Sequence, residues 1–543
     1  MSSKRWILLS LVATLAALLF VAARYERTRV PVDVIFTPTF ALGSVATTAD
    51  AIKGFDTHLQ RPSGLATLQA FLPNQTGVLW LSLMIMLVAG FDYSQPRSGR
   101  NLDLLLAQAI GWCFMGSLDL LTAAVTFNDP AYRELIRLAF VAVTILTGTL
   151  AARTLWRRFR PQPEPAPSAL PINILTVLAV FTVVLNLCVV FMHVPDDSSY
   201  FTSLGGQRLR ERGALPYGDP MLTNTAGAAY APLMYLAQAA AQVAVFEPTN
   251  AESPDHPVLG EHSAYRAPSR LSTQVTLAAF QLLAAGLLFV IGRRLKDQAL
   301  GLTLVALYCG SAFVLGVGGD QEDIGGLSFV SHVIPPALTL AAFATLDRAA
   351  LSGVLLAVAA ASGFYPAFMF PAWLGYYVGR SRKDAINFAL GFAVICVGVL
   401  AWVLVASRPA PGLNLVATIM RDTLGHHTDP AGYGSSFYGL WGQQQGVLGW
   451  LLQPLVAGSS LSSPFFLVFC AYLAATFVLA RQAHVVGLAQ LIATVAMGAN
   501  IWKIHATGSY VTWYYPFLLI GILGPAATTW RSRSGDIVGN THT

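Results

Sequence analysis

The sequence has little charge. Only 11% of its 543 residues are Asp, Glu, Lys or Arg, whereas 55% are hydrophobic. A soluble domain carries about 25% charged residues, so this chain has too few polar side chains to cover a water-exposed surface. The deficit excludes a soluble enzyme, a disordered scaffold and a coiled coil, and it leaves a membrane protein.

Cysteine and the common catalytic motifs are also scarce. The five cysteines lie in or beside apolar runs: Cys113, Cys188, Cys309, Cys396 and Cys470. They lack metal-ligand spacing, and the sequence has no Walker loop, dinucleotide fingerprint or nucleophile elbow, so we predict neither a metal nor a cofactor. The net charge of +6 does not indicate a nucleic-acid partner, because no basic patch is interleaved with aromatic residues.

Apolar sequence is abundant, and it falls in runs of about 20 residues, the length that crosses ~30 Å of hydrocarbon as a helix. These runs predict an all-α, polytopic transmembrane bundle of about fourteen spans, with juxtamembrane helices and loops on the outer face. The spans are expected at 6–24, 77–92, 103–126, 134–153, 171–193, 273–292, 299–316, 331–346, 349–363, 365–379, 385–406, 462–480, 485–500 and 511–529.

Arginines at the ends of the runs predict the orientation. With a cytoplasmic N-terminus and alternating spans, nearly every arginine cluster falls on the cytoplasmic side, as the positive-inside rule requires. This arrangement needs residues 229–246 to form a helix in the outer leaflet that does not cross. We therefore expect a multi-pass protein of the plasma (inner) membrane with both termini in the cytoplasm.

A proline-rich stretch divides the chain. Residues 161–170 predict a stiff cytoplasmic linker between an N-terminal membrane block of about four spans, 1–160, and a larger membrane domain, 171–529. The block has no assigned role. A polar cytoplasmic tail is expected at 530–543.

Polar residues gather in three long outer segments, at 194–272, 317–330 and 407–461. Long loops in compact proteins are usually functional or disordered, and these contain too many aromatic residues for disorder. We expect a binding or catalytic site at the outer face, although solvated linkers are the alternative.

Two carboxylates, Asp196 and Asp197, stand where the span 171–193 leaves the membrane. A carboxylate near a low-dielectric interface has a raised pKa and accepts a proton from a hydroxyl nucleophile. The alternative is that Asp197 or Ser198 caps the helix that follows. Gly213, after a basic last turn, predicts the end of that helix.

The motif residues that follow form a recognisable order. They are Asp196, Tyr200, Gly213, Pro216, Tyr217, Tyr230 and Pro232, then Tyr365, Pro366 and Pro371, and finally the aromatic stretch 433–443. This order resembles the GT-C superfamily of membrane glycosyltransferases, particularly its bacterial polyprenyl-phosphate-sugar-dependent mannosyltransferase-like branch. Two departures concern donor binding: Gly363-Phe364 replaces the lysine that often precedes Tyr-Pro, and Leu233 replaces a second proline.

The resemblance implies an inverting transfer of a hexose or pentose from a polyprenyl-phosphate donor to a lipid or cell-envelope glycan acceptor. Asp196 or Asp197 would be the general base. Membrane lipids are the surrounding partner, and no nucleic acid is involved.

The candidate substrate ligands come from the same outer segments. Guanidinium and ammonium groups suit the leaving phosphate, whereas a basic helix face held at anionic headgroups is the alternative. The phosphate candidates are Arg208, Arg210, Arg212, Arg266 and Lys503. The substrate-binding candidates are Tyr200, Tyr217, Tyr230, Glu322, Tyr438 and Trp441, for which an interfacial aromatic belt or a solvated turn is the alternative.

Two other classes compete with an enzyme. A transporter or flippase of lipid-linked or envelope precursors would carry ionisable residues within its spans, or paired repeats, and the spans have almost none. A sensor or assembly protein would not explain an acidic pair at a span exit followed one helix later by arginines.

Overall fold

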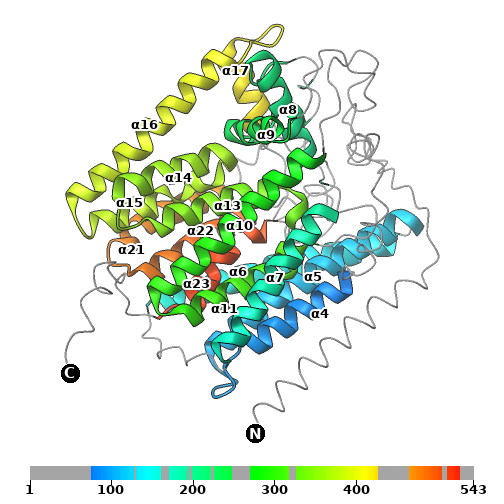
Figure 1. The fold of residues 1–543 in the computed structure, drawn as a ribbon, viewed down its shortest axis with the longest axis vertical. Coiled ribbons are helices and arrows are strands. Elements are labelled where there is room, and N and C mark those ends of the chain that lie inside the picture. Colours follow the sequence, from blue (N-terminus) through cyan, green and yellow to red (C-terminus); the bar gives the residue numbers. More distant parts are fainter. Residues whose placement is uncertain are drawn as a thin grey trace.

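The computed structural model describes residues 75–127, 130–159, 170–192, 195, 198–219, 222, 226–246, 270–316, 326–425, 464–503 and 510–525. Every regular element within these ranges is helical (Figure 1). The expected span 6–24, the linker 161–170 and the tail 530–543 lie outside them, apart from Leu170.

A helix occupies each expected apolar segment from 77–92 onward. The helices are α4 (Gln75–Ile85), α5 (Gly99–Phe127), α6 (Pro130–Arg158), α7 (Ile172–Met192), α10 (Arg270–Leu295), α11 (Gln298–Cys309), α12 (Ala312–Leu315), α13 (Val330–Ala344), α14 (Ala349–Gly363), α15 (Phe370–Val378), α16 (Arg382–Ala406), α21 (Pro464–Ala480), α22 (Val485–Lys503) and α23 (Val511–Leu523). A π-helical turn, Met86–Gly90, extends α4, and a 3-10 turn, Tyr365–Met369, precedes α15.

Three of these helices are long and apolar enough to cross a membrane: Ile172–Phe191, Leu271–Leu295 and Arg382–Ala406. Other apolar helices are shorter. At 1.5 Å per residue the 15 residues of α13 extend about 22 Å, less than the ~30 Å hydrocarbon core. The structure therefore establishes an all-helical, largely apolar chain with three span-length helices in the described part, whereas about fourteen crossings stay a prediction.

The expected span 299–316 is interrupted. Ser311 starts a new helix, because its hydroxyl accepts a hydrogen bond from Val314 N, and Gly316 ends it with φ +41°. The result is α11 followed by the four-residue α12 instead of one continuous helix.

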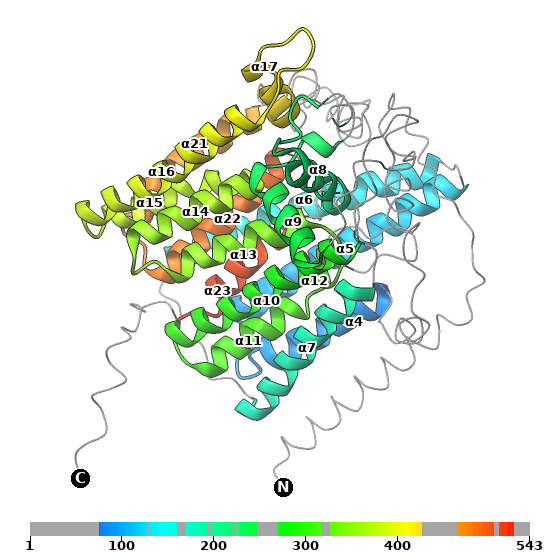
Figure 2. The same ribbon diagram turned by 45° about the horizontal axis from the view of Figure 1, so that its top comes forward.

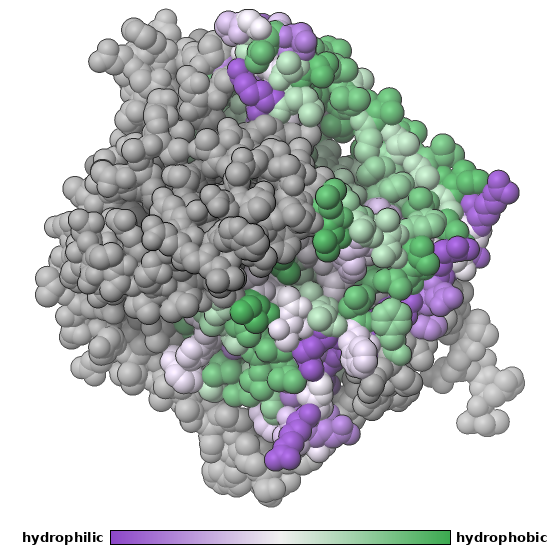
Figure 3. Space-filling model, turned by 180° about the vertical axis from the view of Figure 1, so that it is seen from behind, coloured by the Kyte–Doolittle hydropathy of each residue, from purple (hydrophilic) through white to green (hydrophobic). Residues whose placement is uncertain are grey.

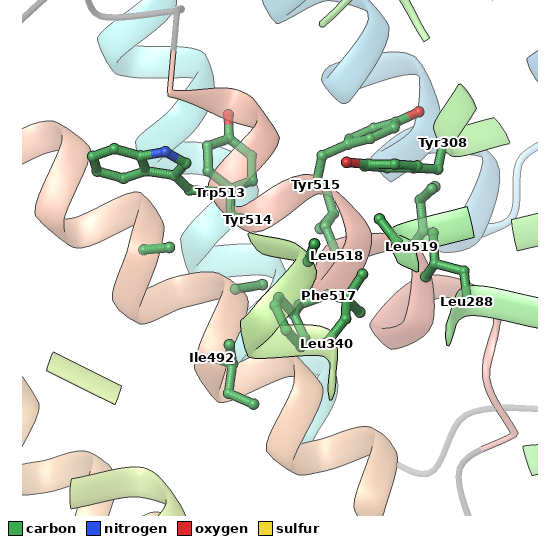
Figure 4. Close-up of a cluster of buried hydrophobic side chains, with 14 of the residues drawn as sticks. Leu288, Tyr308, Leu340, Ile492, Trp513, Tyr514, Tyr515, Phe517, Leu518 and Leu519 are labelled. Carbon is green, nitrogen blue, oxygen red and sulfur yellow. The ribbon is translucent and has the colours of Figure 1, made fainter. Parts of the chain in front are cut away.

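The core is centred on α23, whose residues Val511–Leu523 are all buried. Phe517 packs edge-on against Phe343 of α13, with ring centroids 5.7 Å apart. Figure 4 shows Phe517, Leu518 and Leu519 among Leu340 and Ile492 of the neighbouring helices. On the surface seen in Figure 3, hydrophobic side chains cover most of the described area and hydrophilic ones gather at its margins.

Short basic turns meet at one end of the bundle. Arg294 Nη1 donates to Ala344 O at 2.7 Å, and Tyr377 OH donates to Leu346 O at 3.0 Å. Gly379 lies so close to the Arg481 carbonyl that a Cβ would be 1.8 Å from the oxygen. We call this the basic end. Turns that contain arginine therefore gather at one end of the bundle, as the sequence predicts.

The opposite end, here called the α8 end, carries α8 (Ser198–Arg212), α9 (Pro232–Ala244) and α17 (Leu415–Met420) (Figures 1 and 2). Helix α8 ends where the sequence predicts, since Gly213 has φ +62° and its N–H donates to Leu209 O at 2.9 Å. Helix α9 packs on α8 and α10. It extends about 20 Å, which is too short to cross the ~30 Å hydrocarbon core of a membrane.

Helices α8 and α9 touch backbone to backbone at a glycine. A Cβ on Gly206 would lie 2.7 Å from Gln238 Cβ and 2.9 Å from Ala239 N. Gly206→Ala must therefore push the helices apart, and we expect a destabilisation of about 1–3 kcal/mol, read as a lower thermal unfolding midpoint in detergent. Gly398→Ala is the control, because a Cβ at Gly398 meets nothing within 4 Å. Equal midpoints for both variants would contradict the close α8–α9 contact.

Sidedness is testable with two exposed positions. In a cysteine-free background, Arg212→Cys at the α8 end and Lys383→Cys at the basic end are compared. We expect an impermeant maleimide to label position 212 in intact cells and position 383 only after permeabilisation, because basic turns favour the cytoplasm. The reverse pattern would invert the orientation.

Candidate functional site

The first turn of α8 is hydrogen-bonded to the start of α13. Ser199 Oγ donates to Ser328 O at 2.6 Å and accepts from Val330 N at 3.0 Å. Ser331 Oγ donates to Ser198 Oγ at 3.0 Å. These buried contacts join two helix N-termini that are 130 residues apart in sequence, so the α8 end has a defined geometry where the sequence predicts a site.

The start of α23 joins the same junction. Trp513 Nε1 donates to Ser331 O at 3.0 Å. The His332 ring stacks on Phe329 with centroids 5.0 Å apart and meets Tyr510 edge-on at 5.2 Å. Phe329 and Tyr510 are the N-cap residues of α13 and α23, so the His332 imidazole lies between the two helix starts.

An unusual backbone conformation places Tyr365 on this junction. Phe364 has φ +57°, a region that non-glycine residues rarely adopt. It turns the chain from α14 into the 3-10 turn, where the Tyr365 ring stacks flat on Trp513 at 3.9 Å. The Gly363-Phe364-Tyr365-Pro366 segment of the family-like motif thus reaches the same place as the start of α8.

A buried ion pair connects α8 to the following turn. Arg208 Nε lies 2.8 Å from Asp219 Oδ2, and both side chains are about 95% buried. The turn is held from the other side as well, since Gly218 N donates to Asp422 Oδ2 at 2.8 Å. Gly218 has φ +76° and no room for a Cβ against the Arg408 carbonyl.

The hydroxyl of one predicted substrate tyrosine, Tyr217, and that of Tyr235 bond to the backbone around Tyr230. Tyr217 OH donates to Tyr230 O at 2.7 Å, while Tyr235 OH accepts from Tyr230 N at 3.0 Å and donates to Gly227 O at 2.8 Å. Tyr200 and Tyr217 are both almost fully buried. Burial raises the pKa of the Tyr200, Tyr217 and Tyr235 phenols, so they stay protonated and keep donating at any physiological pH.

The arginine candidates differ in their surroundings. The charge of Arg208 is compensated by Asp219. Arg210 Nη2 lies 3.6 Å from Glu211, and Arg212 is exposed at the end of α8. Their joint role in binding a donor phosphate stays a prediction.

The remaining candidates lie outside the described residues: Asp196, Asp197, Arg266, Glu322, Tyr438 and Trp441. Lys503 is the last residue of α22, and its side chain is also outside the description. In the described ranges, no three His, Cys, Asp or Glu side chains form a group that could hold a metal.

A second charged cluster lies where α5 begins and α6 ends. Asp103, at the start of the expected span 103–126, is fully buried and forms ion pairs with Arg153 and Arg157 of α6. The cluster lies at the ends of the two helices, where the sequence predicts arginines, and the structure adds their pairing with Asp103. Sequence patterns could not pair these residues, because they are about 50 positions apart on two helices whose packing brings them together.

Sequence reasoning also missed Asp219, His332 as part of a junction, Asp422 and Trp513. The only signal available was the concentration of polar and aromatic residues in the outer segments. The contacts of Asp219 with Arg208, Asp422 with Gly218 and Trp513 with Ser331 span 11, 204 and 182 positions, and periodicity does not report such contacts.

The chain matches no protein-family model, no curated protein and no solved structure. The contacts at the α8 end are therefore the basis for the function proposed below.

The Arg208–Asp219 pair gives a stability prediction. Asp219→Asn leaves a buried guanidinium without its counter-charge, so we expect a loss of about 3–5 kcal/mol. Arg208→Met combined with Asp219→Leu removes both charges and should recover much of that loss. Thermal unfolding midpoints of the single and double variants in one detergent test this, and a double variant no more stable than Asp219→Asn would contradict a buried pair.

Proposed function

We propose that the protein is an integral membrane glycosyltransferase. It transfers a hexose or pentose from polyprenyl phosphate to a lipid or glycan acceptor of the cell envelope at the outer face of the membrane. The observation that carries the proposal is the anchoring of α8 by Ser199. The acidic pair Asp196–Asp197 directly precedes this helix in the sequence, and Ser199 in the first turn of the helix bonds to Ser328 O and Val330 N.

In the proposed reaction, Asp196 or Asp197 takes the proton from the acceptor hydroxyl. The acceptor oxygen attacks the anomeric carbon, the bond from that carbon to the phosphate oxygen breaks, and polyprenyl phosphate leaves with inversion at the carbon. Helix N-termini carry a partial positive charge that favours an ionised carboxylate, which is the form that a base requires. No cofactor takes part.

Position in the fold supports an outer-face reaction. The polar junction lies at the end opposite the basic turns, and the positive-inside rule places such turns in the cytoplasm. A lipid-linked donor suits this site, because its sugar is presented at the membrane surface while the isoprenoid chain stays among apolar helices.

A transporter or flippase of lipid-linked precursors is the second candidate. It is favoured by polar groups inside the bundle: the Asp103 cluster, and Gln281 Nε2, which donates to Asn186 Oδ1 at 2.5 Å in the buried interior. Buried polar groups among membrane helices often mark a transport path. Asn186 Nδ2 also bonds to Cys309 O at 2.6 Å, so part of this network joins helices.

The decisive experiment is a transfer assay with purified protein in lipid vesicles. Radiolabelled mannose, glucose or arabinose on polyprenyl phosphate is offered, and the Asp196→Asn/Asp197→Asn variant is compared with wild type. We expect transfer to fall about 100-fold or more, because the acceptor hydroxyl loses its base.

The matched control is Asp347→Asn/Asp384→Asn, which removes two carboxylates at the basic end and should leave transfer unchanged. Full activity in the Asp196/Asp197 variant would remove the catalytic assignment. Absence of transfer by folded wild-type protein, with movement of the labelled lipid across the vesicle, would favour the flippase.

A further inference from the structure

We propose that the N-terminal turns of α13 and α23, together with His332 between them, form a phosphate-binding site for an isoprenoid phosphate. This inference rests on the proposed function for the identity of the lipid, and it names the residues that hold the phosphate. It assigns that role to a place that contains no arginine or lysine among the described residues.

The first observation is the convergence of helix starts. The rings of the two N-cap residues, Phe329 and Tyr510, both contact the His332 ring. Trp513, in the first turn of α23, donates to the carbonyl of Ser331 in the first turn of α13. The two N-termini are therefore adjacent and share one junction.

The second observation concerns charge. A helix N-terminus carries about half a positive charge and presents backbone N–H groups without intrahelical partners. Neither helix has an acidic residue in its first turn, and neither N-cap side chain accepts a hydrogen bond. Ser199 Oγ accepts from Val330 N, and the N–H groups of His332 and Trp513 donate to the N-cap carbonyls of Phe329 and Tyr510 at 3.0 and 3.1 Å. Together the ends favour an anion.

The third observation is independent of the helix dipoles. His332 is 96% buried, and its Nδ1 has no hydrogen-bond partner in the described structure. The hydroxyl of Thr512, in the first turn of α23, is likewise buried without a partner. Buried polar atoms in folded proteins are nearly always paired, so the unpaired Nδ1 of His332, in the tautomer that carries its proton there, leaves a donor between the two helix starts for a ligand with acceptor atoms.

A phosphate group would supply the hydrogen-bond acceptors and the negative charge that this junction lacks. Its oxygens accept hydrogen bonds from several directions and carry the negative charge that the helix ends favour. The surrounding rings of Phe329, Tyr510 and Trp513 supply apolar surface for the first isoprene units of a lipid phosphate. The predicted phosphate ligand Arg208 lies 2.8 Å from Asp219, which balances its charge.

The test measures binding rather than turnover. Full-length protein in nanodiscs is titrated with farnesyl phosphate, farnesol and inorganic phosphate, and binding is followed by tryptophan fluorescence. His332→Phe keeps an aromatic ring but removes both nitrogens, whereas His332→Asn restores a donor. We expect His332→Phe to lower the affinity for farnesyl phosphate about 10-fold or more, and His332→Asn to recover part of that affinity. Neither variant should change the affinity for farnesol.

His484→Phe is the control, because His484 is an exposed histidine directly before α22 at the basic end. Unchanged farnesyl phosphate affinity in folded His332→Phe would overturn the site, as would an equal loss for farnesol. Inorganic phosphate that competes with the same dependence on His332 would support the site and identify the free anion as a ligand. A requirement for the isoprenoid chain would support the lipid phosphate.

The two proposals fail separately. If the Asp196/Asp197 variant retains transfer while farnesyl phosphate binding depends on His332, the phosphate site stands and the catalytic proposal fails. If transfer needs the aspartates but the affinity for farnesyl phosphate does not depend on His332, the catalytic proposal is supported and the phosphate site is wrong.

Discussion

The Ser199 hydroxyl is the contact on which the α8 end depends. It donates to Ser328 O and accepts from Val330 N, so it satisfies one polar group before α13 and one within it. Helix α8 is polar, yet Ser198–Arg208 are all buried, which is costly unless each group finds a partner. Gln242 Nε2 of α9 donates to Ser203 O at 2.9 Å and so supplies a partner for another buried polar group of α8.

The charged groups at the two ends of the bundle are stabilised in different ways. At the basic end, arginines bond to backbone carbonyls or stay exposed, and Arg294 also approaches Asp347. At the α8 end, the buried charge of Arg208 is matched by Asp219, whereas α13 and α23 have no acidic residue in their first turns. The partial positive charge of these helix starts is the property on which the proposed binding of a lipid-linked anion rests.

Local patterns predicted the helices well, because a helix start or stop depends on a few neighbouring residues. Gly213 ends α8 as expected, and α9 begins at Pro232 within the segment expected not to cross. Ser311 was missed as a second helix start, since the apolar run continues through it. Contacts within the candidate site could not be predicted in this way. Tyr217 and Tyr230 are predicted substrate ligands, and only the structure shows that the Tyr217 hydroxyl bonds to the Tyr230 carbonyl.

By itself the sequence determined that the chain is helical and apolar, and it located the polar segments and the helix α8, because composition and short-range periodicity control those properties. Only the tertiary structure decided which polar groups are already paired. Arg208 lies against Asp219 and the Tyr217 hydroxyl bonds to the Tyr230 carbonyl, whereas His332 is buried with an unpaired nitrogen between two helix starts. Pairing of this kind depends on where distant helices meet, and the 130 residues between Ser199 and the start of α13 carry no local signal of that meeting.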